Sequence, residues 1–271
     1  MHQLVSYNGR IIEATSAVIE SKNEAALYGR GIFTTMAIRA GSLLLWDKHW
    51  RRLTGNGKAL SLDLQTFTES DVLAHCDRLL AANGVIDGRA RITFFDGRSP
   101  NLWPSETRGD TVLLILTGEI HAKAQSLKLG VSPFRLHSQS PLTGIKSCNY
   151  LERIVALDEA KSRGSDEAIV LNEDGLITSG VMSNVFWAKG DELFTPRLTT
   201  GCLAGTTREF LLETMDVSEV GEGIETLSDA DAIYLTSAGI GVLRVAQFEG
   251  RKISGECAAL ENAWQNVKAR A

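Results

Sequence analysis

The 271-residue sequence has few cysteines, no excess of positive charge and no long apolar run. Its four cysteines are scattered without a Cys-x-x-Cys pair, so there is no pattern of a disulfide framework or a zinc site. The formal net charge of −5 argues against a basic surface for nucleic acid or membrane lipids. The longest apolar runs, such as residues 112–116, have the length of a strand and are too short to span a membrane.

An export signal and metal-ligand spacing are also missing from the sequence pattern. Residues 1–5 lack a basic stretch followed by an apolar one, and the five histidines show no ligand spacing. We therefore expect a cytoplasmic protein with reduced thiols and no bound metal. What is present is an ordinary globular composition, 44% hydrophobic and 23% charged, sufficient for one large core or two modest ones.

Hydrophobic patterning predicts an α/β (α+β) protein of two domains. Asn8-Gly9 between two alternating stretches is typical of a β-hairpin. The hairpin opens a small N-terminal α+β domain, residues 1–118, and residues 119–126 are the predicted linker. A larger second domain covers residues 127–271. The expected strands are 32–38, 89–95, 111–117, 127–133, 167–172, 176–178, 184–188 and 232–236, and the expected helices are 47–60, 69–83, 149–163, one beginning at 206, and 255–268.

A single lysine, Lys146, lies between a turn and the helix expected at 149–163. Its apolar neighbours suggest that its amine is shielded from solvent, which disfavours the ammonium form and lowers the pKa. A lysine of this kind is nucleophilic and can form a Schiff base with a carbonyl compound. The alternative is a surface lysine whose stem packs on apolar neighbours.

Residues 203–209 read Leu-Ala-Gly-Thr-Thr-Arg-Glu, which is typical of a helix N-terminus that binds phosphate. Thr206 and Glu209 match a capping box, and the glycine leaves the first N–H groups accessible at the positive end of the helix dipole. The hydroxyls of Thr206 and Thr207 add donors, and Arg52 is a candidate bidentate donor to the same anion. The alternatives are a helix cap with nothing bound and a solvated surface arginine.

A nucleophilic lysine and a phosphate site together indicate pyridoxal 5′-phosphate (PLP). Six stretches resemble, in order and spacing, the fold-type IV PLP enzymes, which include branched-chain and D-amino-acid aminotransferases and aminodeoxychorismate lyase. The stretches are 28–33 (Tyr-Gly-Arg-Gly-Ile-Phe), 49–53 (His-Trp-Arg-Arg-Leu), 146–151 (Lys-Ser-Cys-Asn-Tyr-Leu), 166–169 (Asp-Glu-Ala-Ile), 183–186 (Ser-Asn-Val-Phe) and 205–208 (Gly-Thr-Thr-Arg).

The resemblance implies a larger C-terminal domain with a mixed, barrel-like sheet that binds PLP, and a homodimer in which each partner helps to line the other's site. It implies that Lys146 carries PLP and that Arg52, Thr206 and Thr207 bind its phosphate. The other cofactor-binding residues that it implies are Leu203 against the ring, Tyr150 near the phenolic oxygen, Asn184 and Ser179. The expected substrate is a small amine or amino acid, contacted by Tyr28, Phe33, Ser237 and Ala238. Arg98 is a candidate carboxylate clamp, with an exposed turn arginine as the alternative.

One position departs from the family pattern. Family members carry a glutamate five residues before the asparagine of the Asn-Val-Phe motif, where it keeps the pyridine nitrogen protonated, and counting back from Asn184 gives Ser179. A neutral hydroxyl cannot hold that proton electrostatically, so the ring should be a poorer electron sink. Transamination depends on that sink more than the elimination of a good leaving group does.

The run Phe33-Thr34-Thr35 also resembles aminodeoxychorismate lyase rather than the aminotransferases. In the lyase the second threonine is a candidate proton donor, which is Thr35 here; two β-branched strand residues are the alternative interpretation. The sequence therefore predicts a lyase that releases pyruvate to give 4-aminobenzoate. An aminotransferase acting on branched-chain or D-amino acids and a PLP-binding protein without turnover remain the alternatives.

Overall fold

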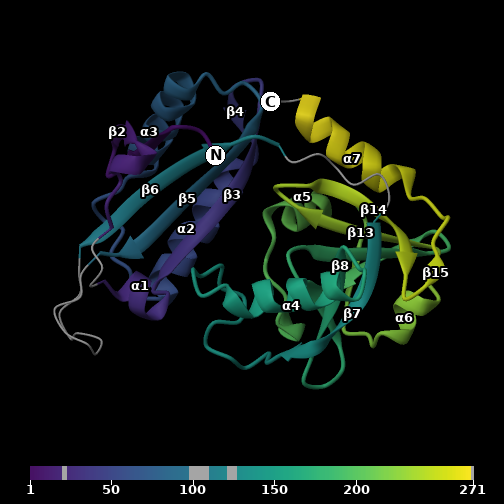
Figure 1. Cartoon of the computed structure of the whole chain (residues 1–271). Helices are drawn as coiled ribbons and strands as arrows, with labels where there is room; N and C mark the ends of the chain where they lie inside the picture. The colour runs from purple at the N-terminus through teal and green to yellow at the C-terminus, as the bar shows by residue number, and fades with distance from the viewer. Residues whose placement is uncertain (20–22, 98–109, 121–126, 270–271) are drawn as a thin grey trace. The chain divides into compact units, whose positions relative to one another are not determined.

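The computed structural model describes residues 1–19, 23–97, 110–120 and 127–269 (Figure 1). The chain divides into two compact units, the first formed by Met1–His121 with Ile145–Asn149 and the second by Ala122–Gly144 with Tyr150–Arg270. The segment around Lys146, which the sequence assigned to the second domain, thus packs with the first unit, because its backbone pairs with a strand there. Residues 121–126 of the predicted linker lie outside the described residues, and the boundary at 118 stays a prediction.

In the described part of the first unit, six strands form one sheet in the order β2-β1-β6-β5-β3-β4. Neighbouring strands run antiparallel. The predicted hairpin is confirmed, since Asn8 and Gly9 connect β1 to β2 with φ of 47° and 78°, the left-handed values that this turn requires. The strands are β1 (Leu4–Tyr7), β2 (Arg10–Glu13), β3 (Gly31–Arg39), β4 (Ser42–Leu43), β5 (Gly88–Asp96) and β6 (Thr111–Gly118).

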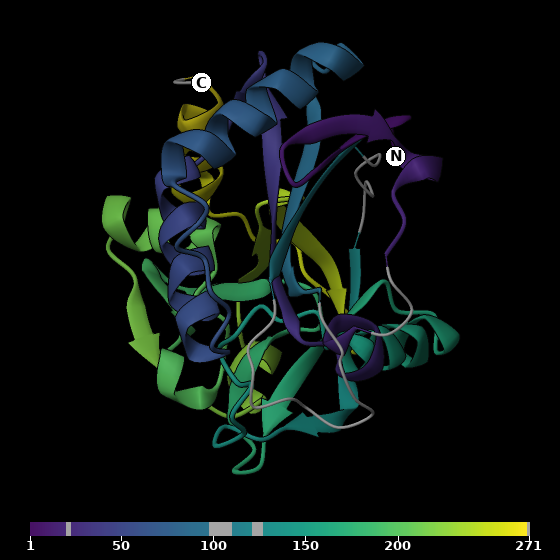
Figure 2. The same cartoon turned by 90° about the vertical axis from the view of Figure 1, so that its left-hand side faces the viewer.

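Helices α2 (Trp46–Ala59) and α3 (Glu69–Asn83) cover one face of this sheet, as Figure 2 shows, and α1 (Glu24–Tyr28) precedes β3. Alternate residues of β3 and β5, such as Ile32 and Ile92, are buried against Leu53 and Leu79 of these helices. Because side chains alternate along a strand, the residues in between, including Phe33 and Arg91, lie on the other face of the sheet.

The second unit is built on a mixed sheet whose strands follow the order β12-β11-β10-β13-β14-β7-β8-β9 in the described residues, with β15 beside β14. The pairs β7–β8, β7–β14 and β11–β12 are parallel, and the others are antiparallel. The strands are β7 (Leu127–Leu136), β8 (Glu167–Asn172), β9 (Ile177–Gly180), β10 (Asn184–Lys189), β11 (Glu192–Pro196), β12 (Ser218–Val220), β13 (Ala232–Ser237), β14 (Gly241–Phe248) and β15 (Arg251–Lys252).

The curled sheet of the second unit encloses a core that includes Ile169, Val185, Trp187 and Leu235. A second cluster packs α5 (Thr206–Thr214) and α7 (Ala258–Ala269) on the sheet, and a third packs α4 (Leu151–Ser162) against β8. Helix α6 (Glu225–Ser228) follows β12. Among the residues that the structure describes, no helix combines the length and the apolar composition that crossing a membrane requires.

Candidate functional site

The backbone around Lys146 is hydrogen-bonded to the start of β3. The backbone N–H of Phe33 donates to the carbonyl oxygen of Lys146 at 2.9 Å, and the N–H of Cys148 donates to the carbonyl of Gly31 at 2.7 Å. Ser147 forms a β-bridge with Ile32. These bonds attach a segment far along the chain to the start of β3, so the position of Lys146 is set by the first unit's sheet.

The side chain of Lys146 is half-buried over an aromatic ring. Its Nζ lies 4.6 Å from the centroid of the Phe33 ring, and the guanidinium carbon of Arg91 lies 3.6 Å from the same centroid. Both distances are within the range of a cation–π contact. The open face of the first unit's sheet therefore gathers Phe33, Arg91 and Lys146 in one positively charged cluster.

Arg52 of α2 is fixed by a threonine of the neighbouring strand. Its guanidinium donates to Thr34 Oγ1 at 2.8 Å, and Thr34 Oγ1 lies 2.6 Å from His49 Nδ1. Because arginine is only a donor, the Thr34 oxygen accepts this bond, and its own proton is available to His49 Nδ1. A bond donated by Thr34 would suit the neutral His49 tautomer that carries its proton on Nε2.

His49 is 1% exposed, and its pKa lies well below the ordinary value of 6.5. The largest cause is burial, followed by the positive charges of Arg52 and Lys146. A neutral imidazole is what the hydrogen bond from Thr34 requires. Thr34 and His49 had no assigned role at the sequence level; the signals were the i, i+3 spacing of His49 and Arg52 on a helix and the placement of Thr34 on the helix-covered face.

In the second unit, the Thr206 region forms a helix N-terminus, but not with the predicted cap. Helix α5 begins at Thr206 and its N-cap is Gly205, which offers no side-chain cap. The capping box of Thr206 and Glu209 is therefore wrong by one position. A Cβ on residue 205 would lie 1.9 Å from Asn184 Oδ1, so only glycine lets the backbone approach Asn184 this closely.

Asn184 orders the chain that enters this helix. Its Nδ2 donates to the carbonyl of Leu203 at 2.9 Å, while its Oδ1 faces Gly205. Arg208, which is 3% exposed, donates to the carbonyl of Pro196 at 2.8 Å and pairs with Glu219. Asn184 on one side and Arg208 on the other thus fix the start of α5. The N–H groups of Thr207 and Arg208 lie in its first turn, where backbone N–H groups have no partner within the helix.

Three buried hydroxyls of the second unit lack a hydrogen-bond partner within the described ranges, those of Ser179, Thr207 and Thr236, and the first two are at predicted site residues. Thr207 Oγ1 lies in the first turn of α5 and Ser179 Oγ lies on β9, and the two residues are 1% and 2% exposed. A buried hydroxyl without a partner costs about 1–3 kcal/mol. Both groups can therefore serve a bound molecule that accepts hydrogen bonds.

A buried acid holds the turn that follows Ser179. Glu167 accepts from the N–H of Met182 at 3.2 Å and from Ser183 Oγ at 3.1 Å. Burial raises the pKa of Glu167, and these hydrogen bonds partly oppose the shift. Glu167, the second residue of the Asp-Glu-Ala-Ile stretch, thus fixes the connection between β9 and β10. Ser179 lies on β9 before this connection, and Asn184 begins β10 after it.

The remaining predicted residues are distributed over both units. Tyr28 ends α1 and is 42% exposed, and Thr35 is half-buried on the open face of the first sheet. Tyr150 is half-buried at the start of α4, with the guanidinium carbon of Arg153 5.9 Å from its ring centroid. Ser237 Oγ accepts from the N–H of Ile240 at 3.3 Å and so holds the turn that contains Ala238. Arg98 lies outside the described residues.

Comparison with known proteins decides the family. The model of the family described as amino-transferase class IV matches residues 31–248. A relative from Bacillus subtilis (strain 168), named aminodeoxychorismate lyase, is 31% identical over 257 residues, which cover 91% of this chain and 87% of the relative. The chain belongs to the class IV aminotransferase family. Enzymes of this family depend on PLP.

The class IV relatives include more than one activity. A protein of Bacillus licheniformis named D-alanine aminotransferase is 26% identical, with 92% of this chain and 89% of the relative covered. The crystal structure of a branched-chain aminotransferase from Thermoproteus uzoniensis with norvaline matches with a TM-score of 0.91 at 23% identity, covering 99% of this chain and 94% of that one. The predicted two-domain fold-type IV architecture is confirmed.

The residues of this class IV chain fit the cofactor of the family. Thr207 Oγ1 and the first-turn amides of α5 are donors suited to a phosphate, and Gly205 brings the backbone close. Ser179 Oγ is a buried donor suited to an unprotonated ring nitrogen.

Proposed function

We propose that this protein is a PLP-dependent lyase that converts 4-amino-4-deoxychorismate into 4-aminobenzoate and pyruvate. The observation that carries the proposal is Ser179, a buried hydroxyl where the family pattern has a glutamate. Support also comes from the 31% identical relative named aminodeoxychorismate lyase and from the Phe33-Thr34-Thr35 run. We also propose that the enzyme works as a homodimer in the cytoplasm.

In this proposal Lys146 binds the PLP aldehyde, while Arg52, Thr206 and Thr207 bind the phosphate. Leu203 packs on the ring, Tyr150 lies near the phenolic oxygen, and Ser179 donates to the ring nitrogen. Asn184 acts through the loop at Leu203 and Gly205, which it positions. The Thr34 hydroxyl holds Arg52 for the phosphate.

Bound PLP supplies an electron-withdrawing group that acidifies the amine-bearing carbon of the substrate. With its amine released by the substrate amine, Lys146 would take the proton from that ring carbon, and the carbon–oxygen bond to the enolpyruvyl group would break. Thr35 would pass a proton to the departing enolate, which leaves as pyruvate, and the Lys146 ammonium would return a proton to Thr35 as the ring becomes aromatic. Aromatisation makes the elimination strongly downhill, so a ring nitrogen that Ser179 leaves unprotonated is sufficient.

The second candidate is an aminotransferase of branched-chain or D-amino acids. The 26% identical D-alanine aminotransferase favours it. In that case Ser179 acts on the ring nitrogen through a water molecule or a neighbouring group. A PLP-binding protein that has lost turnover is the third candidate.

The proposal is tested by a coupled assay for pyruvate with 4-amino-4-deoxychorismate, run beside a panel of amino donors and keto acids. We expect pyruvate release and only slow conversion of the cofactor to its amine form by amino donors. Lys146→Ala should lose both the absorbance of the protein-bound cofactor and turnover. Rapid amino-group transfer without pyruvate release would identify an aminotransferase, and neither activity would identify a protein without turnover.

A further inference from the structure

The aromatic ring of Phe33 on β3 contacts two cations, and one of them is the amine that the proposed reaction uses. Lys146 Nζ lies over the ring at 4.6 Å from its centroid, and the guanidinium carbon of Arg91 lies at 3.6 Å. Phe33 is only 4% exposed. The negative face of an aromatic ring attracts a cation, and it does so more strongly where water is excluded.

The fold brings the amine to this ring from a distant part of the sequence. The N–H of Phe33 donates to the carbonyl of Lys146 at 2.9 Å, and Ser147 forms a β-bridge with Ile32. Ile32 and Ser147 are both buried, and Ile32 packs in the core beneath α2 and α3. Because side chains alternate along paired strands, Phe33 and Lys146 lie together on the opposite, open face of the sheet.

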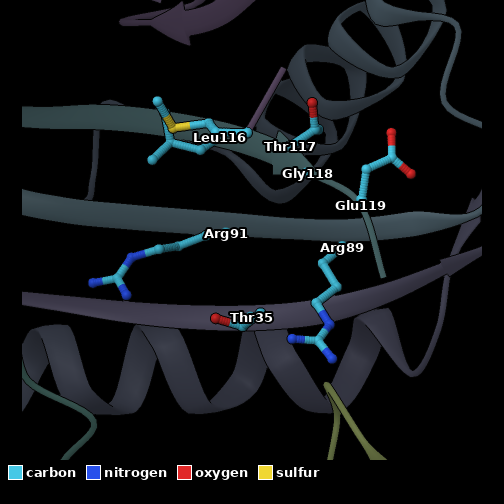
Figure 3. A pocket seen from close by; sticks show the side chains of 8 residues that line it. Thr35, Arg89, Arg91, Leu116, Thr117, Gly118 and Glu119 are labelled. Carbon is cyan, nitrogen blue, oxygen red and sulfur yellow. The ribbon is translucent and has the colours of Figure 1, made fainter. Parts of the chain in front are cut away.

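Arg91 sets the electrostatic surroundings of the ring. Its Nε donates to Thr93 Oγ1 at 3.3 Å, which orients the side chain. Arg91 also lines a cavity of about 230 Å³ on this face, where its side chain and that of Arg89 extend in different directions (Figure 3). An arginine stays protonated, so it repels a second cation nearby. The ring of Phe33 offsets part of this repulsion at the amine of Lys146.

Two further titratable groups near Lys146 are neutral near pH 7. Burial lowers the pKa of His49 on α2, and burial raises the pKa of Cys148 on the lysine's own segment. Arg52 of α2 stays charged and contributes, like Lys146, to the lowered pKa of His49. The proton on Lys146 is therefore held against two constant guanidinium charges, so an attractive ring at the amine shifts the balance toward the ammonium form.

We propose that Phe33 is a positioning residue for the proton transfer, because its ring stabilises Lys146 as an ammonium. The inference rests on the proposed function, in which the Lys146 amine takes a proton from the substrate and later returns it to Thr35. The proton turns the amine into a cation, and that cation forms beside the ring that attracts it. An aliphatic side chain of similar size would shield the amine without stabilising the cation. The family resemblance gives Phe33 only as a substrate contact.

The test measures the proton on Lys146 in the full chain without cofactor. Acylation by acetic anhydride is followed over a series of pH values, and mass spectrometry reads the peptide that contains Lys146. Only the neutral amine reacts, so the pH of half-maximal reaction reports its proton. In Phe33→Leu we expect this pH to fall by at least about 0.5 unit, the scale of a half-buried cation–π contact. Phe33→Tyr keeps the ring and should behave like the wild type.

Three controls separate the ring from the fold. Phe95→Leu is the matched control, since Phe95 is also 4% exposed and pairs with Gly31 on the same face, and it should leave the pH of half-maximal reaction unchanged. Arg91→Met removes a like charge and should raise that pH. Lys161, an exposed lysine of α4, is the internal reference in every sample.

An unchanged pH of half-maximal reaction in a folded Phe33→Leu protein, or an equal fall in Phe95→Leu, would overturn the proposal. If Phe33→Leu does not fold, trifluorophenylalanine at position 33 keeps the shape of the ring and weakens its negative face. The same fall is then expected, and no change would overturn the proposal.

The pyruvate assay fails separately. A fall in Phe33→Leu without pyruvate release by the wild type would keep the effect of Phe33 on Lys146 and remove the lyase. Pyruvate release by the wild type without that fall would keep the lyase and remove the role of Phe33.

Discussion

The guanidinium of Arg52 donates a hydrogen bond to Thr34 Oγ1 at 2.8 Å, so a strand threonine holds a helix arginine in place. The same hydroxyl is hydrogen-bonded to the Nδ1 of the buried His49, at a distance of 2.6 Å. The three side chains form a chain of hydrogen bonds that runs from the arginine through the hydroxyl to the imidazole. If Arg52 binds the PLP phosphate, this chain determines where the guanidinium lies.

We expect Thr34→Val to weaken PLP binding by about tenfold, or ~1.4 kcal/mol, because Arg52 loses the acceptor that orients it. Binding of pyridoxal, which lacks the phosphate, should change little. The affinities of the apoprotein for both compounds, measured by fluorescence quenching, give the answer. Thr34→Ser should restore the PLP affinity.

The controls lie on the same helix turn. Arg52→Gln should show the full loss of PLP affinity, and Arg51→Gln should show none, since Arg51 is exposed and lies 3.4 Å from Asp47. If Thr34→Val lowers the affinities for PLP and pyridoxal equally, the hydroxyl supports the fold and not the phosphate contact.

The stability of the protein should fall as the pH drops below about 6.5, because of His49. Its folded-state pKa is lowered by burial first and by Arg52 and Lys146 next, whereas the imidazole of the unfolded chain titrates near 6.5. Between the two pKa values the unfolded state binds a proton that the folded state does not, so acid favours unfolding, by up to ~1.4 kcal/mol per pH unit.

Urea unfolding at pH 7.5 and pH 5.5 measures this dependence. In His49→Asn the amide oxygen can still accept from Thr34, but the titrating group is gone, so the loss of stability between the two pH values should be smaller. Parallel pH profiles for the wild type and the variant would contradict a neutral, buried His49.

Thr207→Val should act in opposite directions on the apoprotein and on cofactor binding. The variant removes a buried hydroxyl that has no partner in the described structure, so the apoprotein should be as stable as the wild type or more stable. PLP should bind more weakly by about 1–2 kcal/mol, the scale of one hydrogen bond to a charged group. Thermal unfolding with and without PLP reports both effects, and an unchanged PLP affinity would remove Thr207 from the phosphate site.

Local sequence signals predicted much of this molecule. The Asn8-Gly9 hairpin and the helices ending at Asn83 and Ser162 follow from turn residues and periodicity, which depend only on near neighbours. The pairing of Ser147 with Ile32 could not be predicted, because it joins segments distant in sequence. The cap of α5 was misplaced by one residue for a related reason: Gly205 is required by Asn184, a contact from another strand.

The candidate site shows the same division. Lys146, Arg52 and Thr207 were predicted as site residues from residue chemistry and from the resemblance to a family. Thr34 and His49 were not, because a strand threonine and a helix histidine are common residues whose importance depends on packing. Only the fold shows which face of β5 is open and which hydroxyl meets Arg52.

The measurement that tests the central claim most directly compares elimination with amino-group transfer in the wild type and in Ser179→Glu. A carboxylate at this position should raise the pKa of the ring nitrogen and favour transfer, with a gain of at least about tenfold in the amino-donor half-reaction relative to pyruvate release, or ~1.4 kcal/mol of barrier. Ser179→Ala is the control for a variant that folds poorly, and it should retain elimination without gaining transfer. A wild-type half-reaction that outpaces pyruvate release, with no gain in Ser179→Glu, would contradict both the role of Ser179 and the assignment as a lyase.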